Sequence, residues 1–154
     1  MPLPGWCLPE VFPPAREPQT AKEWLAYYDL RWRVLRAPWQ QPKGSEKDEL
    51  EDTAIHRMIV DNNMVIAIGR LHFIDDGTAQ IRYMAVDADY EKQGLGKQIL
   101  FSLEQTAKQQ QINKILLHAR ENATGFYEKH GYTCIKPSHT LYGEIKHFLM
   151  EKNL

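Results

Sequence analysis

Residues 91–98, EKQGLGKQ, join a strand-like run to a helix-like run through two glycines and two lysines. A helix that begins in this loop leaves its first backbone N–H groups without intrahelical partners, beside the positive end of its dipole. Glycines allow a ligand to approach the backbone closely because they carry no Cβ. These features suit a phosphate, although an ordinary tight turn uses the same residues. The loop lacks the third glycine of a dinucleotide fingerprint and the pattern of a Walker loop.

Histidines and carboxylates are the other residues that could do chemistry. The six histidines show no close paired spacing, so the sequence predicts no metal site. Residues 46–52 hold five carboxylates in seven positions. Such a run either attracts a cationic ligand or forms a solvated helix face with acids near its start. Both readings stay open at this point.

The elements that must position these residues begin with a proline-rich segment. Six of the nine prolines lie in residues 1–18, which predicts an extended arm with an edge strand near residues 10–16. Thr20 is expected to cap a helix over residues 21–36, which Pro38 ends. The spacing of Leu25, Tyr28, Trp32 and Leu35 predicts the buried stripe of that helix. Ser45 is expected to cap a short acidic helix that runs to about Asp52.

The rest of the chain alternates between the period of a strand and that of a helix. Residues 54–60, 64–74 and 78–86 are predicted to form an antiparallel meander, with turns at DNN and DDG. A helix over 96–110, a strand over 113–119, a short helix ending near Gly131, and strands over 132–136 and 143–150 follow. This order predicts one α+β (mixed α/β) domain over residues 1–154.

Composition excludes several classes of protein. The chain has 154 residues, a net charge of −1 and no basic stripe, so we expect no nucleic-acid partner. No apolar run approaches 18 residues, and the first ten residues lack the pattern of a secretion signal, so we expect no membrane association. Cys7 and Cys134 are too few for a disulfide framework. A cytoplasmic location is therefore expected.

Two signatures together resemble the GNAT family of acyl-CoA-dependent N-acyltransferases. The run EKQGLG resembles its [Q/R]-x-x-G-x-[G/A] pyrophosphate signature, and FYEKHGY at residues 126–132 resembles its second common signature. The resemblance covers roughly residues 10–152. More narrowly, runs such as AIGRLHF and HARENATGFYEKHGY resemble the acetyltransferase half of bacterial proteins that carry a hotdog thioesterase-like domain, which these 154 residues do not contain.

The resemblance implies a fold, a cofactor and a reaction. The fold would be a central, mostly antiparallel sheet with a splayed parallel strand pair and flanking helices. The reaction would transfer an acetyl group from acetyl-CoA to a primary amine of a small molecule or a protein, by direct attack; family habit suggests a homodimer. The implied cofactor-binding residues are Met84, Ala85, Val86, Glu91, Lys92, Gln93, Gly94, Leu95, Gly96, Lys97, Arg120 and Phe126.

The catalytic residues are also carried over by resemblance. Tyr127 matches the general acid that would protonate the leaving thiolate. Gln80 stands where one branch of the family has its base, a glutamate, so that mechanism does not carry over. The base candidates are His72 and His147, with His56 and the carboxylates Glu51 and Asp52 as further choices.

The resemblance leaves the acceptor and the donor open. Glu91 stands where the family usually has Gln or Arg, and Arg120 stands where many members have Asn. Arg70 and Arg82 are expected to bind substrate and, with Arg120, would favour an acidic acceptor, whereas the run at 46–52 would favour a cationic one. Two alternatives are a regulatory module that binds acyl-CoA without catalysis, and an enzyme that uses another acyl-thioester.

Overall fold

The fold is built on one mixed sheet. The computed structural model describes residues 11–154, and the strand order is β1-β2-β3-β4-β6-β5. Neighbouring strands are antiparallel except β3 and β4, which are parallel, so the expected mixed α/β class is confirmed. The elements are α1 (Ala21–Leu35), η2 (Ala37–Trp39), β1 (Ile55–Asp61), β2 (Met64–Phe73), β3 (Thr78–Val86), η3 (Ala88–Tyr90), α2 (Leu95–Gln109), β4 (Lys114–Arg120), η4 (Glu121–Ala123), α3 (Thr124–Lys129), β5 (Thr133–Leu141) and β6 (Ile145–Asn153).

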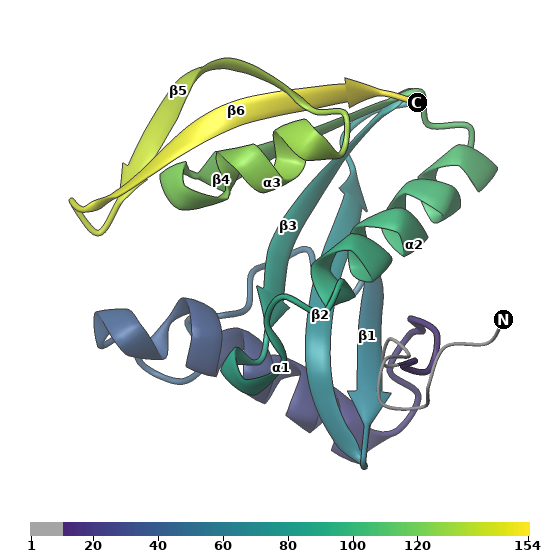
Figure 1. The fold of residues 1–154 in the computed structure, drawn as a ribbon, viewed down its shortest axis with the longest axis vertical. Coiled ribbons are helices and arrows are strands. Elements are labelled where there is room, and N and C mark those ends of the chain that lie inside the picture. The colour runs from purple at the N-terminus through teal and green to yellow at the C-terminus, as the bar shows by residue number, and fades with distance from the viewer. Residues whose placement is uncertain (1–10) are drawn as a thin grey trace, which may run out of the picture.

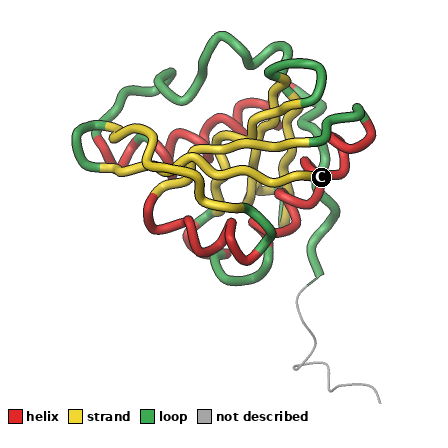
Figure 2. Tube along the Cα trace, turned by 90° about the horizontal axis from the view of Figure 1, so that it is seen from above, coloured by secondary structure: helices red, strands yellow, loops and turns green. Residues whose placement is uncertain are grey.

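Helices cover both faces of the sheet (Figure 2). On one face, the apolar side of α2, with Ile99 and Leu103, packs in a core that includes Ile66 and Ile115. On the other face, α1 packs in a second core that includes Met58 and Ile68 of the first two strands. The sheet is therefore apolar on both sides near its centre, which fixes the strands that carry the site.

Helix α1 begins and ends as its sequence predicts, but a different stripe is buried. The Thr20 hydroxyl accepts a hydrogen bond from the Glu23 amide at 3.1 Å, as expected of an N-cap. Leu25 was expected to face the core and instead is 73% exposed. The fully buried positions are Tyr27, Leu30 and Arg31, because this helix packs through a tyrosine and a neutralised arginine as well as leucine.

Two predicted segments differ in the structure. Residues 45–52 form consecutive turns in place of the expected acidic helix, because two of their carboxylates reach arginines far away in the sequence. The expected edge strand near residues 10–16 is reduced to one antiparallel bridge between Arg16 and Met58, and residue 10 lies outside the described residues.

Strands β3 and β4 diverge after a short parallel contact. They pair only at Thr78 with Lys114, Ala79 with Ile115 and Gln80 with Leu116. Figure 1 shows the two strands fanning apart from the end of the sheet where the C-terminus lies. Beyond Gln80, no residue of β3 pairs with β4 in the part of the chain that the structure describes. The expected splay of the parallel pair is thus present.

A β-bulge in β3 lies beside this splay. Three steps along β3, from Arg82 to Ala85, lie opposite two steps along β2, from Ile68 to Arg70. The extra residue puts Tyr83 at φ +59°, a region that non-glycine residues rarely occupy. Bulges of this kind re-aim side chains next to functional sites.

None of the helices in residues 11–154 is long and apolar enough to cross a membrane.

Candidate active site

The glycine loop forms the first of two cavities, called here the loop cavity. Helix α2 begins directly after Gly94, which has φ +80° and offers no side-chain cap. In residues 11–154, no protein group accepts a hydrogen bond from the amides of residues 95–97. A Cβ built on Gly96 would lie 3.4 Å from Cζ of Phe126, so the loop packs closely on α3. The loop cavity, of about 480 Å³, therefore presents free amides at a helix N-terminus.

Basic side chains surround the loop cavity. Lys92 and Lys97 from the loop, and Lys129 and His130 from the end of α3, line it. Burial lowers the pKa of His130, and the charges of Lys97 and Lys129 lower it further, which shows that these groups lie together. Glu91 is the one carboxylate among the lining residues in the described part of the chain. The balance of charge favours an anion.

The second cavity lies where β3 and β4 diverge and is called here the splay cavity. Its volume is about 330 Å³. Five residues predicted from the sequence line it, from four different elements: Arg82 and Met84 of β3, Arg120 of β4, Tyr127 of α3 and His147 of β6. The divergence of the strands thus brings the expected acid, one expected base and two expected arginines to one place.

Tyr127 is a buried phenol at this cavity. It is 8% exposed and packs edge-on against Phe126 and Tyr132, with ring centroids 5.0 and 5.7 Å away. Its hydroxyl makes no hydrogen bond with residues 11–154. Burial alone raises its pKa, so the hydroxyl keeps its proton at neutral pH. It is a proton donor without a protein acceptor.

His147 belongs to a cluster of three histidines. Its Nδ1 lies 2.9 Å from the Ile145 carbonyl oxygen, which can only accept, so Nδ1 carries the proton and Nε2 keeps a lone pair. The ring stacks on His139 at 4.3 Å, and His139 lies 5.3 Å from His118. Burial lowers the pKa of His147, and the neighbouring His139 and Arg120 lower it further. His147 is thus a neutral imidazole that can accept a proton.

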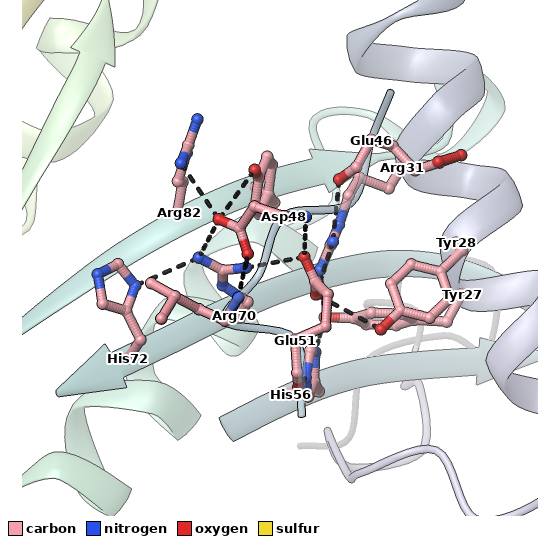
Figure 3. A network of polar contacts seen from close by, with 12 residues as sticks. Tyr27, Tyr28, Arg31, Glu46, Asp48, Glu51, His56, Arg70, His72 and Arg82 are labelled. Carbon is pink, nitrogen blue, oxygen red and sulfur yellow. Dashed lines mark hydrogen bonds and ion pairs between the residues drawn. The ribbon is translucent and has the colours of Figure 1, made fainter. Parts of the chain in front are cut away.

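Two other predicted site residues lie elsewhere. Arg70 is fully buried and donates to Asp48 at 2.6 Å and Glu51 at 2.8 Å. His72 accepts from Arg70 at 3.3 Å, and neither residue lines the splay cavity. Figure 3 shows these residues in a group to which Arg31 contributes a second buried guanidinium, 2.9 Å from Glu51. Arg31, Asp48, Glu51 and Arg70 are called here the carboxylate network.

His56, a further base candidate, contacts a residue of the carboxylate network. Nε2 of His56 donates to the Glu51 carbonyl oxygen at 2.7 Å, and the ring is 1% exposed. His56 therefore holds the turn at residues 45–54 against β1. Its position is structural and remote from the splay cavity.

Tyr83, at the bulge, joins the network to the splay cavity. Its ring lies under four guanidinium groups, with Arg31 at 4.2 Å, Arg82 at 4.6 Å, Arg70 at 4.7 Å and Arg36 at 5.8 Å. An aromatic face attracts such cations. The unusual backbone of Tyr83 is therefore held by contacts on the α1 side of the sheet.

The predicted cofactor residues divide between the two cavities. Eight line the loop cavity, two line the splay cavity, and Ala85 and Gln93 line neither. The eight are Val86, Glu91, Lys92, Gly94, Leu95, Gly96, Lys97 and Phe126, and the two are Met84 and Arg120.

Two polar residues at the splay cavity were missed from the sequence. His118 was not, because the family resemblance implies that the stretch from His118 to Arg120 lies beside the thioester, and both residues line the splay cavity. Arg36, at the end of α1, and His139, in an irregular part of β5, gave no sequence signal. Within residues 11–154, no three histidines, cysteines or carboxylates are arranged to hold a metal ion, the histidine cluster included.

The splayed parallel pair, the glycine loop at the start of α2 and the short helix α3 together define the fold of the acyl-CoA N-acyltransferases. The profile of the Acetyltransferase (GNAT) family matches residues 24–132, and the chain belongs to this family of acyltransferases. It is 30% identical over 128 residues to an uncharacterized N-acetyltransferase, YjcF, of Bacillus subtilis (strain 168), a match that covers 83% of this chain and 90% of the relative.

Solved structures agree on the fold. A crystal structure of an acyl-CoA N-acyltransferase from Pseudomonas aeruginosa superposes with a TM-score of 0.74 at 23% identity, covering 90% of this chain and 96% of that chain. An aminoglycoside 6'-N-acetyltransferase complexed with coenzyme A superposes with a TM-score of 0.74 at 15% identity, covering 87% and 92%. The family resemblance drawn from the two signatures is confirmed, whereas the narrower resemblance to the acetyltransferase half of hotdog fusion proteins stays a prediction.

Proposed function

We propose that this protein transfers an acetyl group from acetyl-CoA to a primary amine of a small molecule or a protein by direct attack, as one acyltransferase domain. The observation that carries the proposal is the buried phenol of Tyr127, which lines the splay cavity with no hydrogen-bond partner in residues 11–154. A phenol that lines a cavity and has no acceptor in residues 11–154 keeps its O–H available to a ligand, as a proton donor requires. Family membership supplies the reaction class.

The donor would occupy both cavities. Its diphosphate would lie on the free amides of residues 95–97, with Lys97 and Lys129 adding positive charge. Its pantetheine arm would pair with the backbone of Met84–Val86, which has no partner on the β4 side. The donor supplies an activated acetyl thioester, and a neighbour of the same fold holds coenzyme A.

Two protein groups would move protons during the reaction. Nε2 of His147 would take a proton from the ammonium, because an amine attacks only through a free lone pair. The nitrogen then bonds to the acetyl carbon while the carbon–sulfur bond breaks. The Tyr127 hydroxyl would donate its proton to the departing sulfur, which leaves as a thiol, and the second proton lost by the attacking nitrogen would restore the hydroxyl through solvent. His72 donates or accepts nothing at this cavity, so we assign it no step in the transfer.

The test is a hydroxyl deletion with a matched control. Tyr127→Phe should lower turnover, measured as thiol release from acetyl-CoA with a panel of amines, by more than about tenfold. Coenzyme A affinity, measured by calorimetry, should change little. Tyr132→Phe removes a hydroxyl from the same motif, one that donates to Glu104 at 2.8 Å, and should leave turnover within about twofold. Equal turnover of the wild type and Tyr127→Phe would reject the assigned acid.

The other expectations from the sequence stay predictions. They are the cytoplasmic location, the homodimer and the lack of a nucleic-acid partner. Tight binding of acetyl-CoA without turnover of any amine would favour the regulatory alternative.

A further inference from the structure

The splay cavity carries charge of one sign. Its charged and titratable lining residues, apart from the tyrosines, are three arginines and three histidines: Arg36, Arg82, Arg120, His118, His139 and His147. No aspartate or glutamate of residues 11–154 lines it. A cavity with several guanidinium groups and no carboxylate repels a purely cationic acceptor and attracts an anionic one.

Two of these guanidinium groups lack any counter-charge. Arg36 is 8% exposed and donates to the carbonyl oxygens of Ser45 and Leu35, each at 3.2 Å. Among residues 11–154, Arg120 donates only to the Leu35 carbonyl oxygen, at 3.5 Å. Within residues 11–154, neither forms an ion pair with a carboxylate. Burial and the nearby charge of Arg36 lower the pKa of Arg120, so the two cations lie close together and oppose each other.

Elsewhere the protein neutralises the arginines that it buries. Arg31 and Arg70 are both 0% exposed, and each has a carboxylate of the network within 3 Å. A buried charge without a partner is costly, so its counter-charge normally comes from the protein or from a ligand. The contrast singles out the buried Arg36, with the half-buried Arg120 beside it, as a pair whose partner comes from outside the chain.

The acidic run does not supply that partner. Asp48 accepts from Arg70 and, at 3.3 Å, from Arg82, while Glu51 is bound to Arg31 and Arg70. Glu46 accepts from the Gly44 amide at 2.9 Å. Glu49 and Asp52 line a different cavity, beside Trp24 and Tyr28. The two sequence signals that conflicted are therefore partly resolved. The carboxylates neutralise Arg70 and contact Arg82, whereas Arg36 and Arg120 line the splay cavity without a carboxylate partner in residues 11–154.

We propose that the acceptor is a small amino acid-like molecule, whose carboxylate binds Arg36 and Arg120 while its amine faces the donor thioester. This inference rests on the proposed acetyl transfer and names its substrate class. A guanidinium holds a carboxylate through two parallel N–H···O bonds, and two guanidinium groups with carbonyl contacts on one side leave donors for it on the other. The volume of about 330 Å³, which must also admit the acetyl group, is at the small end for ligand pockets and suits an acceptor of this size.

The test compares each acceptor with its neutral twin. Thiol release from acetyl-CoA is measured with L-amino acids and with the corresponding carboxamides, which keep the amine and lose the negative charge. Loss of the carboxylate also lowers the pKa of the amine, so more of the carboxamide has the free lone pair needed for attack. A higher rate with the amino acid therefore indicates that the enzyme binds its carboxylate. We expect kcat/KM to favour the best amino acid over its carboxamide by about 10- to 100-fold, the range for a charge-assisted contact.

Matched variants then locate the recognition. Arg36→Gln and Arg120→Gln should each raise KM for the amino acid by about tenfold or more and reduce its advantage over the carboxamide to the same extent, with KM for acetyl-CoA unchanged within about twofold. Arg33→Gln removes the same charge from the exposed face of α1, where Arg33 pairs with Asp29 at 2.8 Å, and should have no effect. A selective rise in KM for acetyl-CoA would show that the arginines serve the donor and would overturn the proposal.

The remaining outcomes separate this proposal from the proposed function. If carboxamides react as well as amino acids, the acceptor proposal fails and acetyl transfer stands. If malonyl-CoA with plain amines is the preferred pair and Arg120→Gln abolishes that preference, the arginines bind the acyl group and the acceptor proposal again fails. If no amine reacts, acetyl transfer fails, and calorimetry decides the acceptor site: the coenzyme A complex should bind an amino acid, and the Arg120→Gln complex should not.

Discussion

Replacing Glu51 by glutamine should destabilise the fold severely, although the residue lies outside both cavities. One carboxylate oxygen accepts from Arg31 and the other from Arg70, and both arginines are 0% exposed. The second oxygen also accepts from the Asp48 amide at 3.0 Å. A glutamine keeps one acceptor and turns its NH₂ group toward donors that then have no acceptor. The variant removes one of the two negative charges that neutralise two buried positive ones.

The size of the effect follows from breaking a buried ion pair by deleting one partner, which costs about 3–5 kcal/mol. A domain of this size has a total stability of about 5–15 kcal/mol, so the loss is a large part of it. In a chain of 154 residues each kcal/mol lowers the melting temperature by about 2–4 °C, which gives a drop of about 6–20 °C.

The assay is thermal unfolding followed by circular dichroism, with Glu49→Gln as the control. Glu49 is an exposed neighbour in the same acidic run and forms no ion pair within residues 11–154. Its substitution removes the same charge and should change the free energy of unfolding by no more than about 0.5 kcal/mol. If the two variants melt within about 2 °C of each other, the carboxylate network does not stabilise the fold as argued.

Three further predictions concern pH and packing. Burial would raise the pKa of Asp48, but hydrogen bonds from Arg70 and the Leu50 amide lower it well below its ordinary value. The stability that this carboxylate contributes is therefore complete above about pH 5 and is lost progressively as the pH falls below about 4. Urea titrations from pH 7 to 2 should show this loss, and Asp48→Asn should flatten it. Because the pKa of His147 is lowered from 6.5, kcat/KM should fall on acidification with a midpoint below pH 6.5, and His147→Gln should remove that limb and about 10²-fold of the rate. Gly69→Ala places a Cβ 2.6 Å from the Met84 sulfur, so it should cost about 1–3 kcal/mol in urea unfolding and raise KM for acetyl-CoA.

Local sequence signals predicted most of the elements of the fold. The Thr20 cap, the meander over β1 to β3 and the glycine start of α2 all depend on neighbouring residues, and the structure has them. The closing strands β5 and β6 are longer than the sequence predicts, because they pair along a hairpin whose length is set by contacts between the two strands.

The acidic segment shows where local reasoning fails. A serine followed by carboxylates favours a helix start, but Asp48 and Glu51 bind Arg70, which lies 22 and 19 residues further along the chain. Ion pairs with buried arginines outweigh a few tenths of a kcal/mol of helix propensity, so the segment forms turns that aim its carboxylates inward. No spacing rule in the sequence reports a partner at that distance.

The candidate site was predictable where a motif or a strand period defines it. The glycine loop and Tyr127 belong to motifs, and Arg82 and His147 lie on strands whose faces alternate. Arg70 was predicted to bind substrate, but it lies against the Tyr83 ring and outside the splay cavity. The bulge that shifts the register between β2 and β3 beside Arg70 has no signal in the sequence. His139 reaches the cavity through irregular pairing after Pro137, which no period predicts.

The carboxylate network and the splay cavity both contain arginines whose positive charges need counter-charges. Four guanidinium groups lie close to the ring of Tyr83. Their positive charges repel one another, so this arrangement is unfavourable unless the charges are neutralised. Asp48 and Glu51 neutralise the two that are fully buried. Arg36, 5.8 Å from the same ring, has no carboxylate partner in residues 11–154 and is left for a ligand. Asp48 and Glu51 are bound to the buried arginines and therefore do not neutralise Arg36 and Arg120 in the splay cavity. Because the same ion pairs fix the arginines around Tyr83, loss of Glu51 should weaken acceptor binding as well as the fold.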